Sequence, residues 1–514
     1  MKFSWLWLSV ILAALGLSRP ALASVEFTIA ADGGGYQVVI PVPANRVKLQ
    51  STPAVVQING ATEHAIADVD ITHHMLWPDA DGQPEFVRAL IVTFPRPLSK
   101  NSVFALKFSA RANEAIKPWS GGALNLADVI FSPDWLSASL YAPLRSTSNR
   151  PPDWFDYAYQ QFGYRMADME SINQDPKIKR NFTTSAPWLY DRVYVLYQLY
   201  FKTGDLYFKH AARASAEIYR SYLNEFGYFS LKPGTDIKYL LSPGMLLDYQ
   251  FYPSSQTRQV INQFFQNSSR WPEQYLPGHT FWTERNLSVA LANAISEWEI
   301  SHSSQSLQRV EQLLSGSKRM LEVAMKDNLN CLAHPYRVHE GRGDDVLVCS
   351  PWMNALLGHQ LFKWWQLTGD EDAAELLMAL ATDVVERGTY QAPKGKIAGL
   401  TVPKYLVFAS PSKFAEQMSH SDLQHACDVA GLLVTARFLS VQQQGDDGYF
   451  KDKMEALLLS CRAILGVDKK NHSWRVKPLR KFNWWFHSTG NLSWQLTQLD
   501  SVEHVNPVIG AGNK

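Results

Sequence analysis

A helix–Thr-Gly-Asp–helix pattern occurs twice in this chain, and it constrains the fold more than any other feature. The first copy covers residues 190–205 and the second covers residues 352–370. In each copy an aromatic-rich segment with helical spacing ends at Thr-Gly-Asp, and another helical segment follows. Glycine adopts the left-handed conformation that ends a helix, and aspartate caps the start of the next helix. The pattern predicts helical hairpins, which build toroids and solenoids when they are repeated.

The period of the apolar residues changes along the chain and indicates two parts. Residues 24–115 contain short alternating runs, such as Tyr36–Ile40 and Ala89–Phe94, separated by turns rich in glycine and aspartate. Such runs are typical of a β-sandwich. Residues 116–152 contain Gly-Gly and Pro-Pro pairs, which favour a linker.

The rest of the chain has helical periodicity. We therefore expect a mainly α protein, with an α/α-toroid domain at residues 153–500 after the small β-sandwich and a C-terminal tail at residues 501–514. The toroid can be incomplete or a six-hairpin barrel. The segments with the clearest helical spacing are residues 188–200, 286–300, 352–367 and 423–439.

Residues 1–23 have the pattern of a secretory signal peptide. Lys2 precedes an apolar run from Phe3 to Leu17, and Ala21-Leu22-Ala23 supplies the small residues of a cleavage site. A membrane anchor is the alternative, but the run is shorter than the ~20 apolar residues that span a bilayer. We expect cleavage after Ala23, no stable membrane insertion, and a mature protein in the bacterial periplasm or outside the cell.

Composition narrows the classes of partner. The chain has 49 basic and 48 acidic residues without a basic block, so nucleic acid is not an expected partner. It contains no P-loop, dinucleotide fingerprint or G-x-S-x-G elbow, and no cofactor is predicted. The 17 Trp and 21 Tyr residues favour sugar binding, because sugar rings stack on aromatic rings, although a large helical core also uses them.

The chain has four cysteines, which an oxidising compartment allows to form disulfides. Cys331 and Cys349 flank a polar segment, and a bond between them would stabilise the fold by about 3 kcal/mol in the loop-entropy model. Four cysteines allow three pairings, so Cys331–Cys349 is a prediction.

The hairpin pattern resembles the α/α-toroid superfamily of polysaccharide-active enzymes, which includes polysaccharide lyases, glycoside hydrolases and uronyl epimerases. The resemblance covers residues 154–499 and rests on the pattern, since the catalytic signature of no single family matches. It implies a polysaccharide or oligosaccharide substrate. It also implies that the loops at one end of the toroid carry the catalytic groups, so polar clusters in loops and at helix starts are the candidates.

Two clusters place a carboxylate at the expected start of a helix. Asp191 follows Trp188 and Tyr190, and Glu284 follows Trp282. Either carboxylate can act as an acid or a base. A helix start also favours a carboxylate through the helix dipole, so a purely structural role stays open for both residues.

The densest cluster covers residues 334–345, between the two cysteines, in an expected loop. Tyr336 or His339 can remove the proton α to a uronate carboxyl, and Arg337 can hold that carboxylate through two hydrogen bonds. A solvated polar loop is the alternative. The segment also contains metal-ligating residues, but their spacing matches no zinc template, so no metal is predicted. These residues are His334, His339, Glu340 and Asp344.

Two more clusters supply histidine and tryptophan. Asp422 and His425 share the expected face of a helix, where a carboxylate can tune an imidazole as a base. A core histidine behind a helix cap is the alternative. Trp484-Trp485, followed by His487, predicts either a sugar-stacking platform or a seal of the core.

Together the clusters define two sets of candidates. The catalytic candidates are Asp191, Glu284, Tyr336, Arg337, His339 and His425. The substrate-binding candidates are Trp188, Tyr190, Arg192, Trp282, His334, Trp352, His420, Trp484, Trp485 and His487.

The function expected first is cleavage of a polysaccharide by a lyase that acts by β-elimination on a uronate-containing polymer. A glycoside hydrolase with a carboxylate pair, for example Asp191 and Glu284, is an alternative. A noncatalytic periplasmic protein that binds glycans or assists exopolysaccharide assembly is another.

Overall fold

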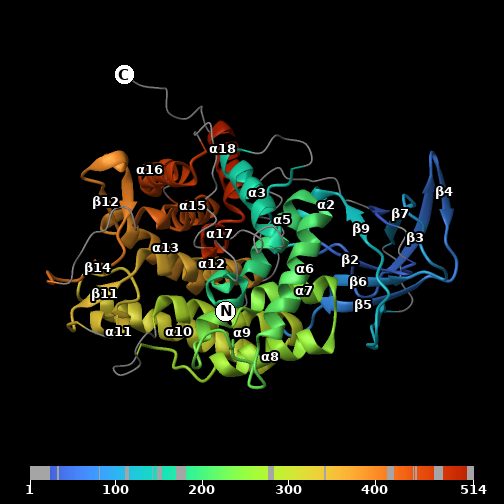
Figure 1. Ribbon diagram of the computed structural model, residues 1–514, viewed down its shortest axis with the longest axis horizontal. Coiled ribbons are helices and arrows are strands. Elements are labelled where there is room, and N and C mark those ends of the chain that lie inside the picture. The colour runs from blue at the N-terminus through green and yellow to red at the C-terminus, as the bar shows by residue number, and fades with distance from the viewer. Residues whose placement is uncertain are drawn as a thin grey trace.

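The fold is taken from a computed structural model (Figure 1). The expected signal peptide, Trp282 and His420 lie outside the residues that the structure describes. The described residues are 24–31, 34–79, 81–109, 115–141, 143–147, 153–169, 181–275, 283–340, 343–413, 422–443, 445, 448–467 and 479–505.

The N-terminal part forms two sheets, as the alternating apolar runs predict. Phe94, which follows a strand of one sheet, packs at 5.0 Å between ring centroids on Phe104 of the other sheet, so the sheets share one apolar core. The neighbouring strands are antiparallel except β5 and β8. One sheet has the described order β4 (Thr62–Ala65), β3 (Thr52–Asn59), β7 (Val103–Ser109), β1 (Ser24–Ile29) and β9 (Val129–Phe131). The other has the described order β2 (Gln37–Pro41), β6 (Val87–Thr93), β5 (Asp70–Leu76) and β8 (Lys117–Pro118).

The segment at residues 116–152, which we expected to be a linker, contributes to the sandwich. It contains β8, β9 and the short helix α2 (Pro133–Ala138). The indole of Trp135 in α2 is buried and donates a hydrogen bond to the carbonyl of Pro41 (2.7 Å). The glycines and prolines of this segment therefore separate short structured elements.

The helices form an inner and an outer ring, so the helical domain is an α/α-toroid. Each inner helix before α18 packs on the outer helix that follows it, and consecutive inner helices pack on one another from α5 to α18. Inner helices such as α12 and α15 are buried on nearly all sides, whereas the outer helices keep an exposed face. The described inner helices are α5 (Arg192–Thr203), α7 (Ser242–Phe251), α9 (Glu284–Ser301), α12 (Pro351–Thr368), α15 (Ala426–Gln442) and α18 (Leu492–Val505). The outer ones are α6 (Leu206–Ser221), α8 (Ser255–Ser268), α10 (Ser304–Met325), α13 (Glu371–Glu386), α16 (Gly448–Leu465) and α3 (Trp154–Ala167).

The two Thr-Gly-Asp segments form the predicted hairpin turns. Gly204 ends α5 with a φ of 69°, and Asp205 accepts a hydrogen bond from the backbone N–H of Tyr207 at the start of α6. Gly369 ends α12 with a φ of 71°, and Asp370 caps α13 in the same way. The prediction of helical hairpins is confirmed at both positions.

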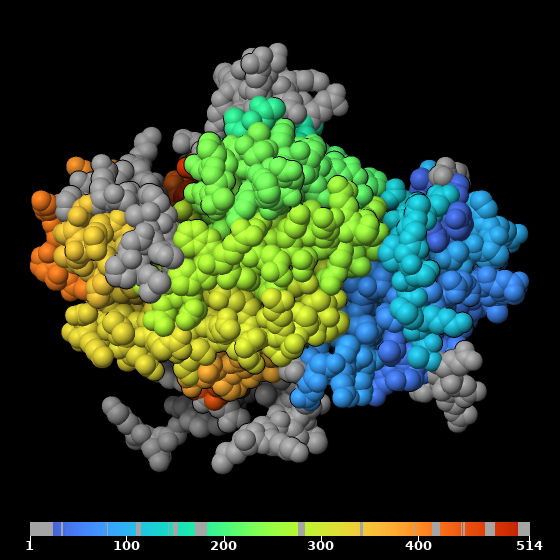
Figure 2. Space-filling model, turned by 90° about the horizontal axis from the view of Figure 1, so that it is seen from below, coloured from blue at the N-terminus to red at the C-terminus, as the bar shows by residue number. Residues whose placement is uncertain are grey.

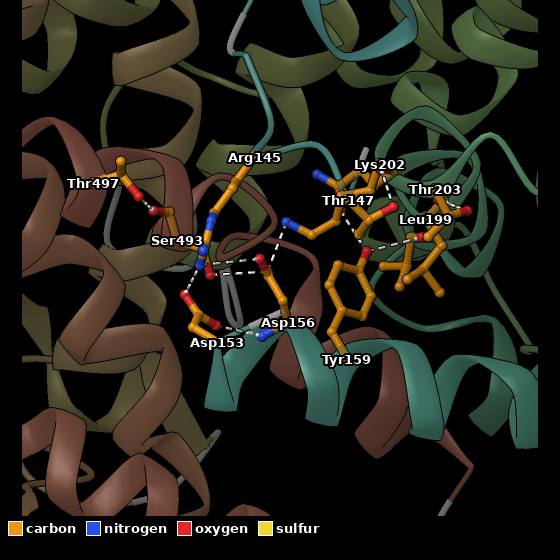
Figure 3. Close-up of polar contacts among 12 residues, drawn as sticks. Arg145, Thr147, Asp153, Asp156, Tyr159, Leu199, Lys202, Thr203, Ser493 and Thr497 are labelled. Atoms are coloured by element: carbon orange, nitrogen blue, oxygen red, sulfur yellow. Dashed lines mark hydrogen bonds and ion pairs between the residues drawn. The ribbon is translucent and has the colours of Figure 1, made fainter. Parts of the chain in front are cut away.

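The ring is closed by elements from the two ends of the helical domain. Figure 3 shows α3 beside α18 and α5, with the carboxylate of Asp156 between them. The Oδ1 atom of Asp156 lies 2.7 Å from Nζ of Lys202 in α5 and accepts a hydrogen bond from Ser493 of α18 (2.8 Å). The short helix α17 (Arg480–Phe486) adds a ring stack between Phe486 and Tyr159, with centroids 4.3 Å apart.

The β-sandwich covers the end of the toroid at which the inner helices finish. Figures 1 and 2 show it packed against one side of the helical body. Arg88 of β6 forms a buried ion pair with Glu299 near the end of α9 (2.6 Å), and Lys363 of α12 contacts the same carboxylate. His74 contacts the carbonyl of Gln250 near the end of α7 (3.0 Å). In the described part of the chain, these contacts of the sandwich lie away from the end where the inner helices begin.

Local details differ from the expectations at two places. Trp188 belongs to a short 3-10 turn (η2, Ala186–Trp188), and Tyr190 and Asp191 are left-handed, so α5 begins at Arg192 rather than at residue 188. The expected loop at residues 334–345 instead contains β10 (His334–Pro335) and α11 (Tyr336–Glu340).

β10 pairs with β11 (Leu347–Cys349), which in turn pairs with β14 (Val407–Phe408). A separate pair, β12 (Thr389–Gln391) and β13 (Thr401–Pro403), lies in the loop after α13.

Two disulfides tie the helical domain together. The predicted Cys331–Cys349 bond is present, and Cys427 of α15 bonds to Cys461 of α16. None of the helices in the described part of the chain combines the length and the hydrophobicity that a bilayer-spanning segment needs.

Candidate functional site

Aromatic rings gather where the inner helices begin. Tyr190 precedes α5, Trp352 lies in the first turn of α12, His425 precedes α15, and Trp484 lies in α17. The ring of Trp352 stacks on His425 with centroids 4.6 Å apart, and Trp484 lies 4.2 Å from His425. Tyr190 lies 6.3 Å from Trp352 and 5.9 Å from Trp484. Residues from distant clusters of the sequence thus meet at one end of the toroid.

Asp191 is held at this end by the starts of two inner helices. Its Oδ1 accepts a hydrogen bond from the N–H of Tyr194 (3.0 Å) and its Oδ2 accepts one from the N–H of Gly244 in α7 (2.8 Å). The side chain is 1% exposed, and this burial raises the pKa of Asp191 to about 7, although both hydrogen bonds oppose the rise. The carboxyl can therefore hold a proton near neutral pH.

The backbone that carries Asp191 is strained. Tyr190 and Asp191 are consecutive non-glycine residues with φ angles of 66° and 54°. Left-handed non-glycine residues cost free energy and persist where the surrounding structure fixes them, often at functional sites. The strain places the side chains of both residues on the wall of the same pocket.

This pocket lies between the starts of α5, α7 and α9. Its cavity volume is about 30 Å³, and polar groups of different charge are among the residues that line it. Arg285 and Lys238 supply two cations, Asp191 supplies the carboxyl, and Gln360 and His487 reach the pocket from α12 and from the residue after α17. Leucine, valine, alanine and proline side chains complete the wall.

Several polar atoms of the lining have no hydrogen-bond partner among the described residues. They are Nε of Arg285, Oε1 of Gln360 and Nδ1 of His487. A buried polar atom without a partner costs free energy, so such atoms around one pocket indicate a polar ligand. Burial lowers the pKa of His487 to about 4, which keeps its imidazole neutral at pH 7.

A second group of polar residues lies at the start of α9. The carboxylate of Glu284 lies 3.6 Å from Nδ1 of His334, and Nε2 of His334 lies 3.1 Å from Nδ1 of His339. All three side chains are buried. Burial raises the pKa of Glu284 to about 8 and lowers that of His339 to about 3.

His425 contacts Asp428 rather than the expected Asp422. Its Nδ1 lies 3.5 Å from Oδ2 of Asp428, which also accepts a hydrogen bond from the indole of Trp484 (2.6 Å). The carboxylate of Asp422 accepts instead from the hydroxyl of Tyr390 (2.7 Å). Burial raises the pKa of Asp428 well above its usual range.

The structure brings together many of the residues that the sequence singled out. Each of the five clusters contributes to the end where the inner helices begin. The residues there are Tyr190, Asp191, Glu284, His334, His339, Trp352, His425, Trp484 and His487.

Other candidates lie away from the pocket. Trp188 is packed among aromatic rings of the core, and Arg192 donates to the carbonyl of Met166 and to Ser215. Trp485 packs on Phe162 and donates to the carbonyl of Gln424. These three side chains fill the spaces between helices.

Two candidates lie on α11 at the outside. Arg337 is half-exposed and pairs with Asp345, and the ring of Tyr336 packs on Phe408. Neither lines the pocket. The cations that line the pocket are instead Arg285, which follows Glu284 in the sequence, and Lys238, which no sequence motif marks.

Comparison with known proteins gives only distant structural likenesses. No family model matches the chain, and no curated protein matches it. The α-1,6-mannanase GH76A of Salegentibacter sp. HEL1_6 has 14% identity and a TM-score of 0.44, covering 67% of this chain and 100% of the mannanase. An unsaturated glucuronyl hydrolase of Streptococcus agalactiae has 10% identity and a TM-score of 0.43, covering 68% and 93%. A polysaccharide lyase has 11% identity and a TM-score of 0.41, covering 65% and 98%.

Proposed function

We propose that this chain is an exported polysaccharide lyase that cleaves a uronate-containing polymer at the pocket between α5, α7 and α9. The observation that carries the proposal is the combination of groups around this one pocket. Two cations, Arg285 and Lys238, lie with a neutral imidazole, His487, and a carboxyl that holds a proton near neutral pH, Asp191. β-Elimination from a uronate needs these three kinds of group.

In this mechanism Arg285 and Lys238 bind the carboxylate of the uronate. Their charge stabilises the anion that forms when the proton on the adjacent carbon, C5, is removed. His487 accepts that proton as the base. Asp191 donates its proton to the glycosidic oxygen at C4 as the C4–O bond breaks, and a C4–C5 double bond forms.

The surroundings favour a sugar substrate. The rings of Tyr190, Trp352 and Trp484 lie buried within 6.3 Å of one another at the same end of the toroid, and Tyr190 lines the pocket. The two disulfides favour an oxidising compartment, in agreement with the proposed export.

The test is turnover of candidate polymers by the purified protein. Alginate, pectin and glycosaminoglycans are incubated with it, and the ultraviolet absorbance of the unsaturated product is followed. Replacing Arg285 with Met removes a charged hydrogen bond worth ~1.5–3 kcal/mol, so kcat/KM should fall roughly 10- to 150-fold. The matched control is Arg337→Met, which removes a half-exposed arginine outside the pocket and should leave turnover unchanged. Equal loss in both variants would contradict the proposed clamp.

A glycoside hydrolase is the second candidate, because the raised pKa of Asp191 also suits the general acid of a hydrolase. The same incubations separate the two reactions. A lyase produces absorbance together with new chain ends, whereas a hydrolase produces new reducing ends without absorbance. Polymer binding without new ends would favour a noncatalytic glycan-binding protein.

A further inference from the structure

Glu284, His334 and His339 form a compact group of metal-ligating side chains. They come from the start of α9, from β10 and from α11, and one nitrogen or oxygen of each lies within 4.8 Å of the others. Ligand atoms around a zinc ion, with bonds of ~2.0–2.2 Å, lie about 3.3 Å from one another. The 3.6 Å between Oε2 of Glu284 and Nδ1 of His334 is close to that separation. The 3.1 Å contact with His339 uses the other nitrogen of His334, and only one of the two nitrogens can bind the same ion.

Two buried atoms of the group, one on Glu284 and one on His334, lack a hydrogen-bond partner in the described part of the chain. Glu284 and His334 are 0% exposed, yet Oε2 of Glu284 and Nδ1 of His334 have no hydrogen-bond partner among the described residues. A carboxylate that is buried away from water needs a cation or hydrogen bonds. Arg285, the next residue, is turned toward the pocket and the ring of Trp352 (5.8 Å). A bound cation would satisfy both unpartnered atoms.

The surrounding structure holds the three residues in place. The backbone N–H of Ser350 donates to Oε1 of Glu284 (2.8 Å), which orients the carboxylate. The Cys331–Cys349 disulfide fixes the segments that carry His334 and Ser350, and β10 and β11 pair between them. Such support from outside the ligand set is usual at metal sites, because it orders the ligands before the ion binds.

We propose that Glu284, His334 and His339 bind one divalent transition-metal ion, with Zn²⁺ as the best match. Two imidazoles and one carboxylate are a ligand set that zinc uses when a fourth position stays open for water or substrate. The second group of possible ligands, Cys331, Cys349 and Asp383, is not a rival, since both cysteines are in a disulfide. The ion would fix the start of α9 and thereby the position of Arg285 at the pocket.

The proposal is tested by metal content, independently of any turnover. Full-length protein without a histidine tag is stripped with a chelator, equilibrated with Zn²⁺, dialysed and measured by inductively coupled plasma mass spectrometry. One zinc per chain is expected. Co²⁺ in place of Zn²⁺ should give the visible absorption of a low-symmetry site. Wild-type protein that retains its fold but no zinc would overturn the proposal, whatever the outcome of the lyase assay.

Substitutions of the proposed ligands test whether the zinc ion binds at this group of residues. His339→Ala and Glu284→Gln should each abolish stoichiometric zinc and the cobalt spectrum. The matched control is His210→Ala, which removes an exposed histidine paired with Asp128 and should keep both signals. Circular dichroism checks that each variant is folded. If a variant does not fold, the wild-type melting temperature decides, since Zn²⁺ should raise it and Mg²⁺ should not. Zinc retained by folded His339→Ala and Glu284→Gln proteins would contradict this ligand set.

Discussion

The buried carboxyl of Asp191 should make the stability of this protein depend on pH in a way that one substitution removes. Burial raises its pKa from 3.8 to about 7, whereas the unfolded chain returns the carboxyl to its ordinary value. Between these values the native state binds one more proton than the unfolded state. The stability that this proton contributes is therefore complete below pH 3.8 and is lost as the pH rises through about 7.

The magnitude follows from the distance between the two pKa values. Each pH unit between them corresponds to ~1.4 kcal/mol, so the contribution of Asp191 amounts to about 4 kcal/mol. Asparagine at this position cannot ionise. From about pH 4 to about pH 8, the free energy of unfolding of Asp191→Asn should thus rise by about 4 kcal/mol relative to the wild type. The comparison is relative because other groups titrate equally in both proteins.

The assay is urea unfolding followed by circular dichroism at several pH values. Asp205→Asn is the control, because Asp205 also caps a helix but is partly exposed to solvent at the start of α6. The free energy of unfolding of the Asp205→Asn variant should change with pH in the same way as that of the wild type. If the free energy of unfolding of Asp191→Asn also changed with pH in the same way as that of the wild type, the reasoning would be refuted. The same pKa predicts that turnover falls about tenfold per pH unit above pH 7, where the acid form of Asp191 is lost.

Three more predictions concern the frame around the site. Cys331→Ala combined with Cys349→Ala should lower the free energy of unfolding by about 3 kcal/mol, measured by urea denaturation under non-reducing conditions. Gly244→Ala would place a Cβ against Oδ1 of Asp191 and 2.8 Å from the N–H nitrogen of Tyr194, so we expect a loss of ~1–3 kcal/mol and of turnover, checked by melting temperature and by product absorbance. Arg88→Met removes one of the two cations that contact the buried Glu299, and a loss of about 3–5 kcal/mol is expected in thermal unfolding.

The hairpins and the sandwich were predictable because they depend on local rules. Glycine followed by aspartate ends one helix and begins another wherever it follows an amphipathic segment, and Gly204 and Gly369 both obey this rule. The left-handed pair Tyr190 and Asp191 breaks the local rules, since it depends in part on the contact of Asp191 with Gly244 of α7. Helical spacing alone therefore placed the start of that helix too early.

Part of the site was predictable for a similar reason. Asp191 and Glu284 stand at helix starts, and a toroid gathers the starts of its inner helices at one end. The direction of a side chain is not a local property, so Arg337 faces solvent although its segment is the most polar in the sequence. Lys238 was missed because it lies in a short turn (η3, Ile237–Tyr239) that no motif marks. The contact of Glu284 with His334 joins separate elements and needs the fold to be seen.

The closure of the ring by α17 and α18 has a consequence for the order in which the protein becomes functional. Asn483 hydrogen-bonds to the carbonyls of Pro187 and Leu189, across sequence separations of 296 and 294 residues. His487 completes the wall that Asp191 begins. A growing chain therefore has no finished pocket until its last helices have been synthesised, and contacts over such separations form slowly.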